Sequence, residues 1–372
     1  MQHVRTGAER LTANPALVPG ERIGLITNPT GVLPDLTPTL DALLTAGVPL
    51  AALFGPEHGM RGTAQAGFSE QDALDPRTGL PVYDTHQISG EKLDAIVSAS
   101  GVDTLVFDIA DVGSRFYTYI WTMYDLLASA RRLGLRFVVL DRPNPLGGTV
   151  TEGPLLDPAF ASFVGRHPLP VRHGRTAGEL ALLFDPEAQV VEMDGWHRDM
   201  TFAETGLPWV MPSVNMPTID TALVYPGTGL FEGTNFSEGR GTTRPFELVG
   251  APYADERFAR ELNALGLPGV RFRETWFTPM FQKHAGVTVC GVQVHVHDAA
   301  AFRPVLTGLS MLHLARTLYP GEFAWWGPNL FMEHLWGSDT LTRCLDSGGD
   351  PRELCGEPGT PDGHLLYTSS RR

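Results

Sequence analysis

The sequence is poor in cysteine and has no long apolar run. Its 372 residues include three cysteines, Cys290, Cys344 and Cys355, too few and too scattered for a disulfide framework or a zinc ribbon, so we expect reduced thiols. No apolar run approaches the ~20 residues of a spanning helix, and the first residues lack the pattern of a signal peptide. We therefore expect no membrane span and, for the sequence as it stands, a cytoplasmic location.

Basic residues are also scarce. The chain has 28 Lys and Arg against 42 Asp and Glu, a net charge of −14, and a pI near 5.3. This balance argues against a nucleic-acid binder, which needs a basic face. The 42% of hydrophobic residues, with only 19% charged residues, excludes a disordered chain.

Several catalytic signatures are missing. The sequence has no P-loop, no GxSxG elbow and no HExxH motif. Gly227 and Gly229 do not form a dinucleotide fingerprint, because the third glycine comes one position late. His295 and His297 alternate on an expected strand, but no second ligand pair follows at a diagnostic spacing. We expect neither a metal nor a cofactor.

Glycine and proline are abundant, with 41 and 30 residues, which is above their usual share. Much of the chain must therefore form shaped turns and loops, where binding sites commonly lie. Tryptophan is less informative. We interpret Trp325, Trp326 and Trp336 as core or interface anchors in preference to a sugar-binding platform.

Strands and helices alternate along the first 200 residues, which predicts an α/β fold with a parallel sheet. The expected strands are 22–27, 48–54, 103–109, 136–140 and 189–193, and the expected helices are 36–46, 91–100, 118–133 and 176–184. Residues 205–253 are expected to be loop. Helices at 254–265 and 302–318 and strands at 270–277 and 287–297 follow. We place a domain boundary near residue 225, giving domains 1–225 and 226–372.

Polar residues follow the expected strands, and ligands of open α/β sheets bind at the carboxyl ends of the strands. The residues concerned are Asn28 and Thr30, then Glu57, His58 and Arg61, then Asp108, Asp111, Ser114, Arg115 and Tyr117, then Asp141, Arg142 and Asn144, with Glu152 soon after. Each alone is typical of a cap or a turn. Together, these carboxylates and arginines predict a ligand site at that edge.

A second dense stretch covers residues 225–244. It contains Glu232, Asn235, Ser237, Glu238, Arg240, Thr242, Thr243 and Arg244, separated by glycines that let a backbone approach a ligand closely. The alternative is an ordered surface loop.

The sequence resembles the exo-β-N-acetylmuramidases of the NamZ type. The resemblance is carried by GLITNPTGV (24–32), FGPEHGMRG (54–62), FDIADVGSRFYTYIWTM (107–123), DRPNPLGG (141–148), EGP (152–154), PVRHGRTAGELA (170–181), TGLPWVMPSVNMPT (205–218) and YPGTGLFEGTNFSEGRGTTRPFE (225–247). Two small departures occur, Val214 where the family has Pro and Gly229 where it has Cys.

The resemblance implies a Rossmann-like N-terminal catalytic domain and a smaller α+β C-terminal domain that completes the cleft. It also implies release of N-acetylmuramic acid from the non-reducing end of peptide-free peptidoglycan fragments, in cell-wall turnover and recycling. Many relatives carry an export signal, so export stays open. Two alternatives remain: another hydrolase or lyase of a muramyl or amino-sugar acid, and a non-catalytic binder of cell-wall fragments. The oligomeric state is not predicted.

Glycoside cleavage needs an acid and a second carboxylate. We expect Glu57 to be the general acid, because glycines and a proline hold it on a tight loop at a strand end, and His58 to orient it. Glu152 is the preferred second carboxylate. Asp108 or Asp111 would orient the sugar's acetamido group if the substrate supplies its own nucleophile. Inverting, covalent-retaining and substrate-assisted routes stay open.

N-acetylmuramic acid also carries a lactyl carboxylate, and arginine suits bidentate recognition of such a group. We expect at least one motif arginine to bind it: Arg61, Arg115, Arg142, Arg240 or Arg244. The other expected substrate-binding residues are Asn28, Tyr117, Asn144, Glu232, Asn235 and Glu238.

Overall fold

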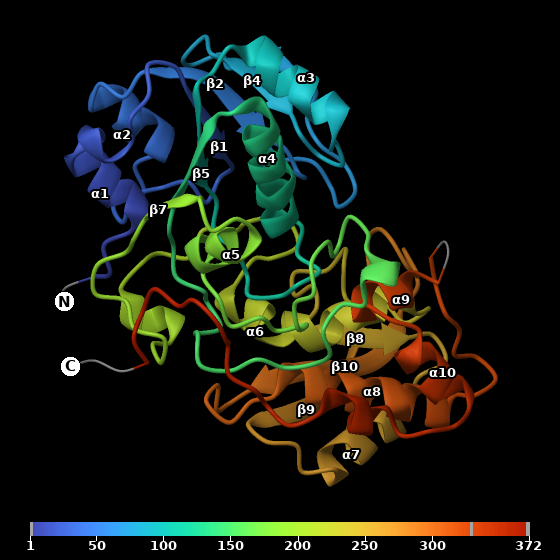
Figure 1. Ribbon diagram of the computed structural model, residues 1–372. Helices are drawn as coiled ribbons and strands as arrows, with labels where there is room; N and C mark the ends of the chain where they lie inside the picture. The colour runs from blue at the N-terminus through green and yellow to red at the C-terminus, as the bar shows by residue number, and fades with distance from the viewer. Residues whose placement is uncertain (1–2, 328–329, 370–372) are drawn as a thin grey trace.

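The chain folds into two parts, each built on its own sheet. The computed structural model describes residues 3–327 and 330–369. A seven-stranded sheet occupies one part, and a three-stranded sheet formed later in the chain occupies the other (Figure 1). The expected α/β fold is confirmed.

The larger sheet is a doubly wound sheet. Its strands are β1 (Ile23–Thr27), β2 (Leu50–Gly55), β3 (Ala73–Leu74), β4 (Pro81–Asp84), β5 (Thr104–Asp108), β6 (Arg136–Leu140) and β7 (Gln189–Val191). They lie in the order β3-β4-β2-β1-β5-β6-β7, and every neighbouring pair is parallel except β3 with β4. Without the edge strand β3, this is the Rossmann strand order. From β1 the chain adds strands first on one side, and from β5 onwards on the other side, so the switch point lies between β1 and β5.

Helices cover both faces of this sheet because its strands carry apolar side chains on both faces. The side chains of Leu25 and Val106 belong to a cluster with α1 (Gly7–Ala13) and α2 (Thr39–Thr45). Those of Ile26 and Phe107 face the other way, into the cluster that contains α3 (Glu91–Ser100), α4 (Tyr119–Leu133) and α5 (Ala177–Phe184). The predicted helix at 176–184 is confirmed, and it begins with the expected capping box of Thr176 and Glu179.

The second part combines an antiparallel sheet with helices. Its strands β8 (Leu248–Ala251), β9 (Val270–Phe277) and β10 (Val289–Val296) lie in the order β8-β10-β9. The helices are α6 (Ile219–Thr228), α7 (Glu256–Ala264), α8 (Pro304–Leu318), α9 (Phe331–Trp336) and α10 (Thr340–Asp346). Short 3₁₀ helices occur at Pro15–Leu17, Pro158–Phe160, Phe202–Thr205, Gly229–Gly233 and Pro351–Cys355.

The expected loop at 205–253 is wrong over much of its length. It contains α6, the 3₁₀ helix Gly229–Gly233 and β8. Proline and glycine near residue 226 disfavour a helix locally, but tertiary packing overrides that preference. At Gly227 and Gly308 the backbones of α6 and α8 touch, with no room for a Cβ atom at either residue. The glycines therefore permit close helix packing, and residue 225 lies inside a helix.

One hydrophobic core joins the two parts. A single cluster of buried side chains extends from Phe107 of β5 to Val292 of β10. The terminal segments also meet, since Val4 and Tyr367 belong to one small cluster with Trp196. All three cysteines are free thiols, as expected. Among the described residues, no helix is long and apolar enough to cross a membrane.

Candidate active site

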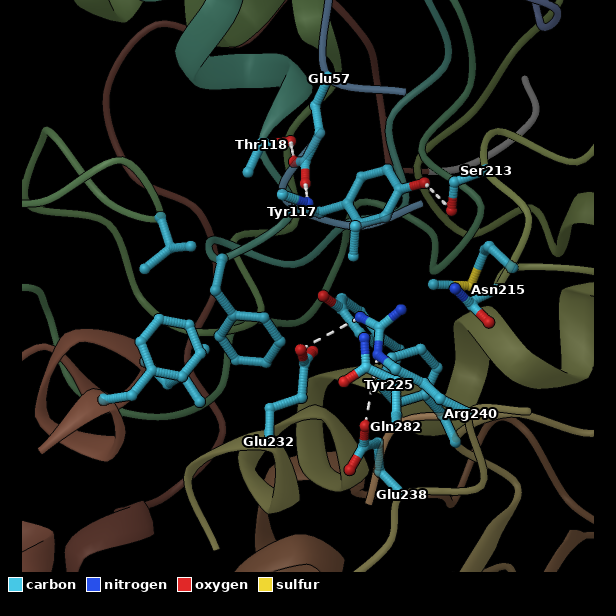
Figure 2. A pocket seen from close by; sticks show the side chains of 18 of the residues that line it. Glu57, Tyr117, Thr118, Ser213, Asn215, Tyr225, Glu232, Glu238, Arg240 and Gln282 are labelled. Carbon is cyan, nitrogen blue, oxygen red and sulfur yellow. Dashed lines mark hydrogen bonds and ion pairs between the residues drawn. The ribbon is translucent and has the colours of Figure 1, made fainter. Parts of the chain in front are cut away.

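A polar cavity lies where the two parts meet. It has a volume of about 280 Å³. The end of β2 and the segment before α4 supply Glu57, His58 and residues 116–118, while the later part supplies Tyr225, Glu232, Glu238 and Arg240. Figure 2 shows Glu57 and Thr118 on one side of this space and Glu232, Arg240 and Glu238 on the other. Residues far apart in the sequence thus face one cavity.

Glu57 is held rigidly at the cavity wall. Its side chain follows β2, and His58 and Gly59 both adopt positive φ, which turns the chain sharply there. One carboxylate oxygen accepts a hydrogen bond from the Gly67 N–H at 2.6 Å, and the other accepts one from the Thr118 hydroxyl at 2.5 Å. The residue is only 6% exposed. Both oxygens are therefore fixed in direction by uncharged donors.

His58 does not orient Glu57 as expected. Its Nδ1 lies 2.7 Å from the Ala64 carbonyl oxygen, so Nδ1 carries the proton of the neutral ring. Burial lowers the pKa of His58, while the charge of Glu57 acts in the opposite direction. The hydrogen bonds that fix Glu57 come from Gly67 and Thr118 instead. His58 remains a cavity residue whose Nε2 is the acceptor.

An arginine bridges two carboxylates across from Glu57. Arg240 donates from Nη2 to Glu232 at 3.1 Å, and its Nε lies 3.3 Å from Glu238. Its guanidinium also stands 4.9 Å from the centre of the Phe246 ring. No hydrogen bond from Nη1 joins it to another residue among those described. Nη1 is therefore available to a ligand.

The pKa values of the two bridged carboxylates shift in opposite directions. Burial raises the pKa of Glu232, and the opposing charge of Arg240 does not cancel that effect. Burial also acts to raise the pKa of Glu238, but Lys283 and Arg240 together lower it. Lys283 contacts Glu238 at 2.8 Å and three backbone carbonyls, so its donors are already used.

Aromatic residues complete the walls. Tyr117 donates to the Ser213 hydroxyl at 3.0 Å, and burial raises its pKa, so the phenol stays neutral. Tyr225 is buried beside it, with ring centroids 5.7 Å apart. Phe163 and Phe331 line the cavity from another side, with rings stacked at 6.2 Å. The site therefore pairs a charged wall with an apolar one, as sugar-sized ligands require.

Comparison with known proteins decides the family. The model described as exo-beta-N-acetylmuramidase NamZ, N-terminal, matches residues 23–220, and its C-terminal counterpart matches residues 223–357. The chain belongs to the NamZ family. The resemblance stated from the motifs is confirmed.

Relatives of this NamZ-family chain cover nearly all of it. It is 47% identical over 354 residues to the peptidoglycan beta-N-acetylmuramidase NamZ of Bacillus subtilis (strain 168), covering 93% of this chain and 85% of the relative. Two crystal structures of DUF1343 family proteins from Bacteroides fragilis NCTC 9343 are similar. One gives a TM-score of 0.86 at 34% identity, covering 95% of this chain and 94% of that one; the other gives 0.75 at 29%, covering 95% and 93%.

In this member of the NamZ family, the aspartates expected to orient the acetamido group lie outside the cavity lining. Asp108 is fully buried in a bidentate pair with Arg142, at 2.6 and 3.0 Å, which joins the ends of β5 and β6. Asp111 accepts from the Gly113 N–H and pairs with His173 at 3.0 Å. These contacts engage Asp108, Arg142 and Asp111 with other protein groups beyond the carboxyl ends of β5 and β6.

Glu152 and Arg115 fasten the two parts of the NamZ chain to each other. Glu152 accepts from the Val305 N–H at 2.9 Å and from Arg303 at 3.3 Å. Arg115 is fully buried and donates to four carbonyls, those of Pro154, Leu169, Leu335 and Trp336. Burial lowers the pKa of Arg115 to about 9. Neither side chain is among the residues that line the cavity.

The remaining expected ligand-binding residues also have other partners. Asn28 accepts from the Thr30 N–H and hydroxyl, Asn144 bonds to Arg175 and Leu146, and Asn235 bonds to Tyr253 and residues 322–324. Arg61 pairs with Asp75 at 2.6 Å and Arg244 with Glu247 at 3.0 Å. Of the five arginines considered, the cavity contains Arg240 alone.

Sequence reasoning missed several cavity residues. Thr118, Ser213 and Asn215 lie inside the family motifs but carry no charge that would single them out. Gln282 and Lys283 lie outside every motif quoted, in a segment that reaches the site only through the fold. Trp326, interpreted as an anchor, lines the cavity and is 53% exposed. Trp336 does fit the anchor interpretation, because it is fully buried.

Proposed function

We propose that this protein is an exo-acting β-N-acetylmuramidase, which hydrolyses the glycosidic bond that links a terminal N-acetylmuramic acid to the next sugar of peptidoglycan. The supporting observation is one cavity in which Glu57 faces Glu232 and Arg240 (Figure 2). The Bacillus subtilis relative named as a peptidoglycan beta-N-acetylmuramidase supports the same reaction.

Glu57 is the general acid in this proposal. Its two hydrogen-bond partners, Gly67 and Thr118, are uncharged, and no cation pairs with it among the described residues. The Thr118 hydroxyl can donate to the carboxylate and can also accept from the protonated acid. The side chain can therefore hold a proton, give it to the leaving oxygen and stay in place.

Glu232 takes the place expected for Glu152 as the second carboxylate. It enters the cavity from the opposite side, and although burial raises its pKa, the charge of Arg240 acts in favour of the ionised form. A carboxylate there stabilises the positive charge that develops on the sugar ring as the bond breaks. Burial limits competing water and strengthens that interaction.

Arg240 binds the lactyl carboxylate. Its Nη1 forms no hydrogen bond with a described residue, and the contacts with Glu232 and Glu238 fix the plane of the group. The cavity volume of about 280 Å³ is at the small end of ligand pockets and suits one amino sugar. We expect peptide-free fragments to be the substrates, in cell-wall turnover and recycling.

Incubation with the disaccharide of N-acetylmuramic acid linked to N-acetylglucosamine, followed by mass spectrometry, tests the proposal. The expected products are the two free amino sugars. Release of lactate would indicate cleavage of the lactyl ether by a different enzyme class. Calorimetry that detects binding without turnover would indicate a binder of cell-wall fragments.

A further inference from the structure

One tryptophan that lines the cavity is largely exposed. Trp326 lines the cavity and is 53% exposed. The adjacent Trp325 is partly buried, and its indole N–H contacts Asp346 at 3.2 Å. A large indole is normally buried for its apolar surface. Trp326 therefore presents an apolar face that the described part of the protein leaves open.

The backbone fixes this tryptophan beside the proposed second carboxylate. The N–H of Trp326 donates to the Gly233 carbonyl at 2.9 Å, one residue after Glu232. Trp325 pairs with Thr234 in an isolated bridge, and Asn235 N–H donates to the Ala324 carbonyl at 2.9 Å. The two segments thus form a short ladder. These bonds fix the backbone of Trp326 beside the segment that carries Glu232.

The residues that line the cavity differ in exposure. Glu57 and Arg240 are 6% and 8% exposed, whereas Trp326 is 53% exposed. An exo-acting enzyme binds the terminal sugar among the buried residues, so the next sugar lies towards the exposed ones. A pyranose ring offers a face of C–H groups, and an indole offers a matching apolar face with one polar N–H. No hydrogen bond engages Nε1 of Trp326 within the described part of the chain.

We propose that Trp326 is the platform for the N-acetylglucosamine that follows the released muramic acid. This inference rests on the proposed function and adds a second sugar subsite to it. Binding energy from this second sugar holds the glycosidic oxygen next to Glu57. The specificity for the sugar on the leaving side then depends on Trp326, and the specificity for the terminal sugar depends on Arg240.

The test compares Trp326→Ala with Trp276→Ala on the muramyl-glucosamine disaccharide. Trp276 is a matched control because it is 64% exposed on β9 and does not line the cavity. We expect Trp326→Ala to raise KM about tenfold, the size of effect that an aromatic anchor has in an interface, with kcat much less changed. Trp276→Ala should match wild type, and Trp326→Phe should recover most of the lost affinity.

Product inhibition assigns the effect to one sugar. Trp326→Ala should abolish inhibition by free N-acetylglucosamine and leave inhibition by free N-acetylmuramic acid unchanged. The inference is overturned if KM for Trp326→Ala equals that of an active wild type, or if inhibition by muramic acid falls equally. If wild type does not cleave the disaccharide, the proposed function itself fails and this inference with it.

Discussion

The partners of Arg240 hold its guanidinium in place and leave one nitrogen for a ligand. Glu232 and Glu238 hold its guanidinium from two sides, and Nη1 is left for a ligand. Four positions later, Arg244 pairs with Glu247 and is 44% exposed at its side chain. The two arginines lie in the same sequence motif, and only the fold shows that Arg240 lines the cavity and Arg244 does not.

This difference predicts unequal effects of substitution. Arg240→Lys keeps the charge but loses the planar fork, so KM for muramyl substrates should rise about tenfold or more. A glucosaminide without the lactyl group should be much less affected. Arg244→Ala is the control and should leave KM unchanged. Equal losses on both sugars would remove Arg240 from recognition of the lactyl carboxylate.

Asp125 on α4 gives a pH-dependent prediction. Burial raises its pKa to about 6, against the opposing charge of Arg166 at 2.9 Å. Because the folded protein binds this proton more tightly than the unfolded chain does, Asp125 contributes stability below pH 3.8 that is lost as the pH rises through about 6. The free energy of unfolding of wild type should therefore fall by up to about 3 kcal/mol over this pH range because of Asp125. Asp125→Asn should not show this part of the fall.

Urea unfolding of wild type and Asp125→Asn at pH 4 and pH 7.5 measures how steeply the free energy of unfolding changes with pH. The free energy of unfolding should change less with pH in the variant. Identical slopes in the two proteins would show that the pKa of Asp125 is the same in the folded and unfolded states.

At the scale of elements, glycines control how closely helices pack. A Cβ atom at Gly308 would overlap the Gly227 carbonyl oxygen of α6. We expect Gly308→Ala to lower the free energy of unfolding by about 1–3 kcal/mol, the usual effect of overpacking. Gly321→Ala is the control, because its Cβ would meet open space. A melting temperature for Gly308→Ala at or above that of the control would contradict the close packing.

The elements also show what sequence could and could not predict. Continuous apolar runs such as 136–140 predicted the parallel strands, because both faces of the sheet are covered. Helix α6 was missed because Pro226 and Gly227 disfavour a helix locally, whereas packing on α8 stabilises it. The motifs predicted Glu57 and Arg240 as site residues. They could not show that Asp108 forms an ion pair with Arg142, because these two residues lie 34 positions apart in the sequence.

At the scale of the molecule, the cavity exists because two parts are held together beside it. We propose that these parts are separate domains, with α6 assigned to the second because it packs on α8. Arg115 and Glu152 cross the junction through backbone groups of the later part. The C-terminal segment returns to the first part, where the Tyr367 hydroxyl donates to Asp141 at 2.6 Å.

Glu152→Gln tests whether Glu152 holds the two parts together or takes part in catalysis. Loss of the charge that pairs with Arg303 should lower stability by about 1–3 kcal/mol, because Arg303 is partly exposed and burial raises the pKa of Glu152. The melting temperature should fall, and kcat at a temperature where the variant is folded should stay close to wild type. A hundredfold fall in kcat with an unchanged melting temperature would instead make Glu152 the catalytic carboxylate.

The central claim is that Glu57 protonates the leaving sugar. The most direct measurement compares kcat of Glu57→Gln on the muramyl-glucosamine disaccharide with kcat on an aryl muraminide, whose good leaving group needs little protonation. We predict a loss of about a hundredfold or more on the disaccharide, a much smaller loss on the aryl substrate and an unchanged melting temperature. Turnover of the disaccharide near the wild-type rate, or equal losses on both substrates, would contradict the claim.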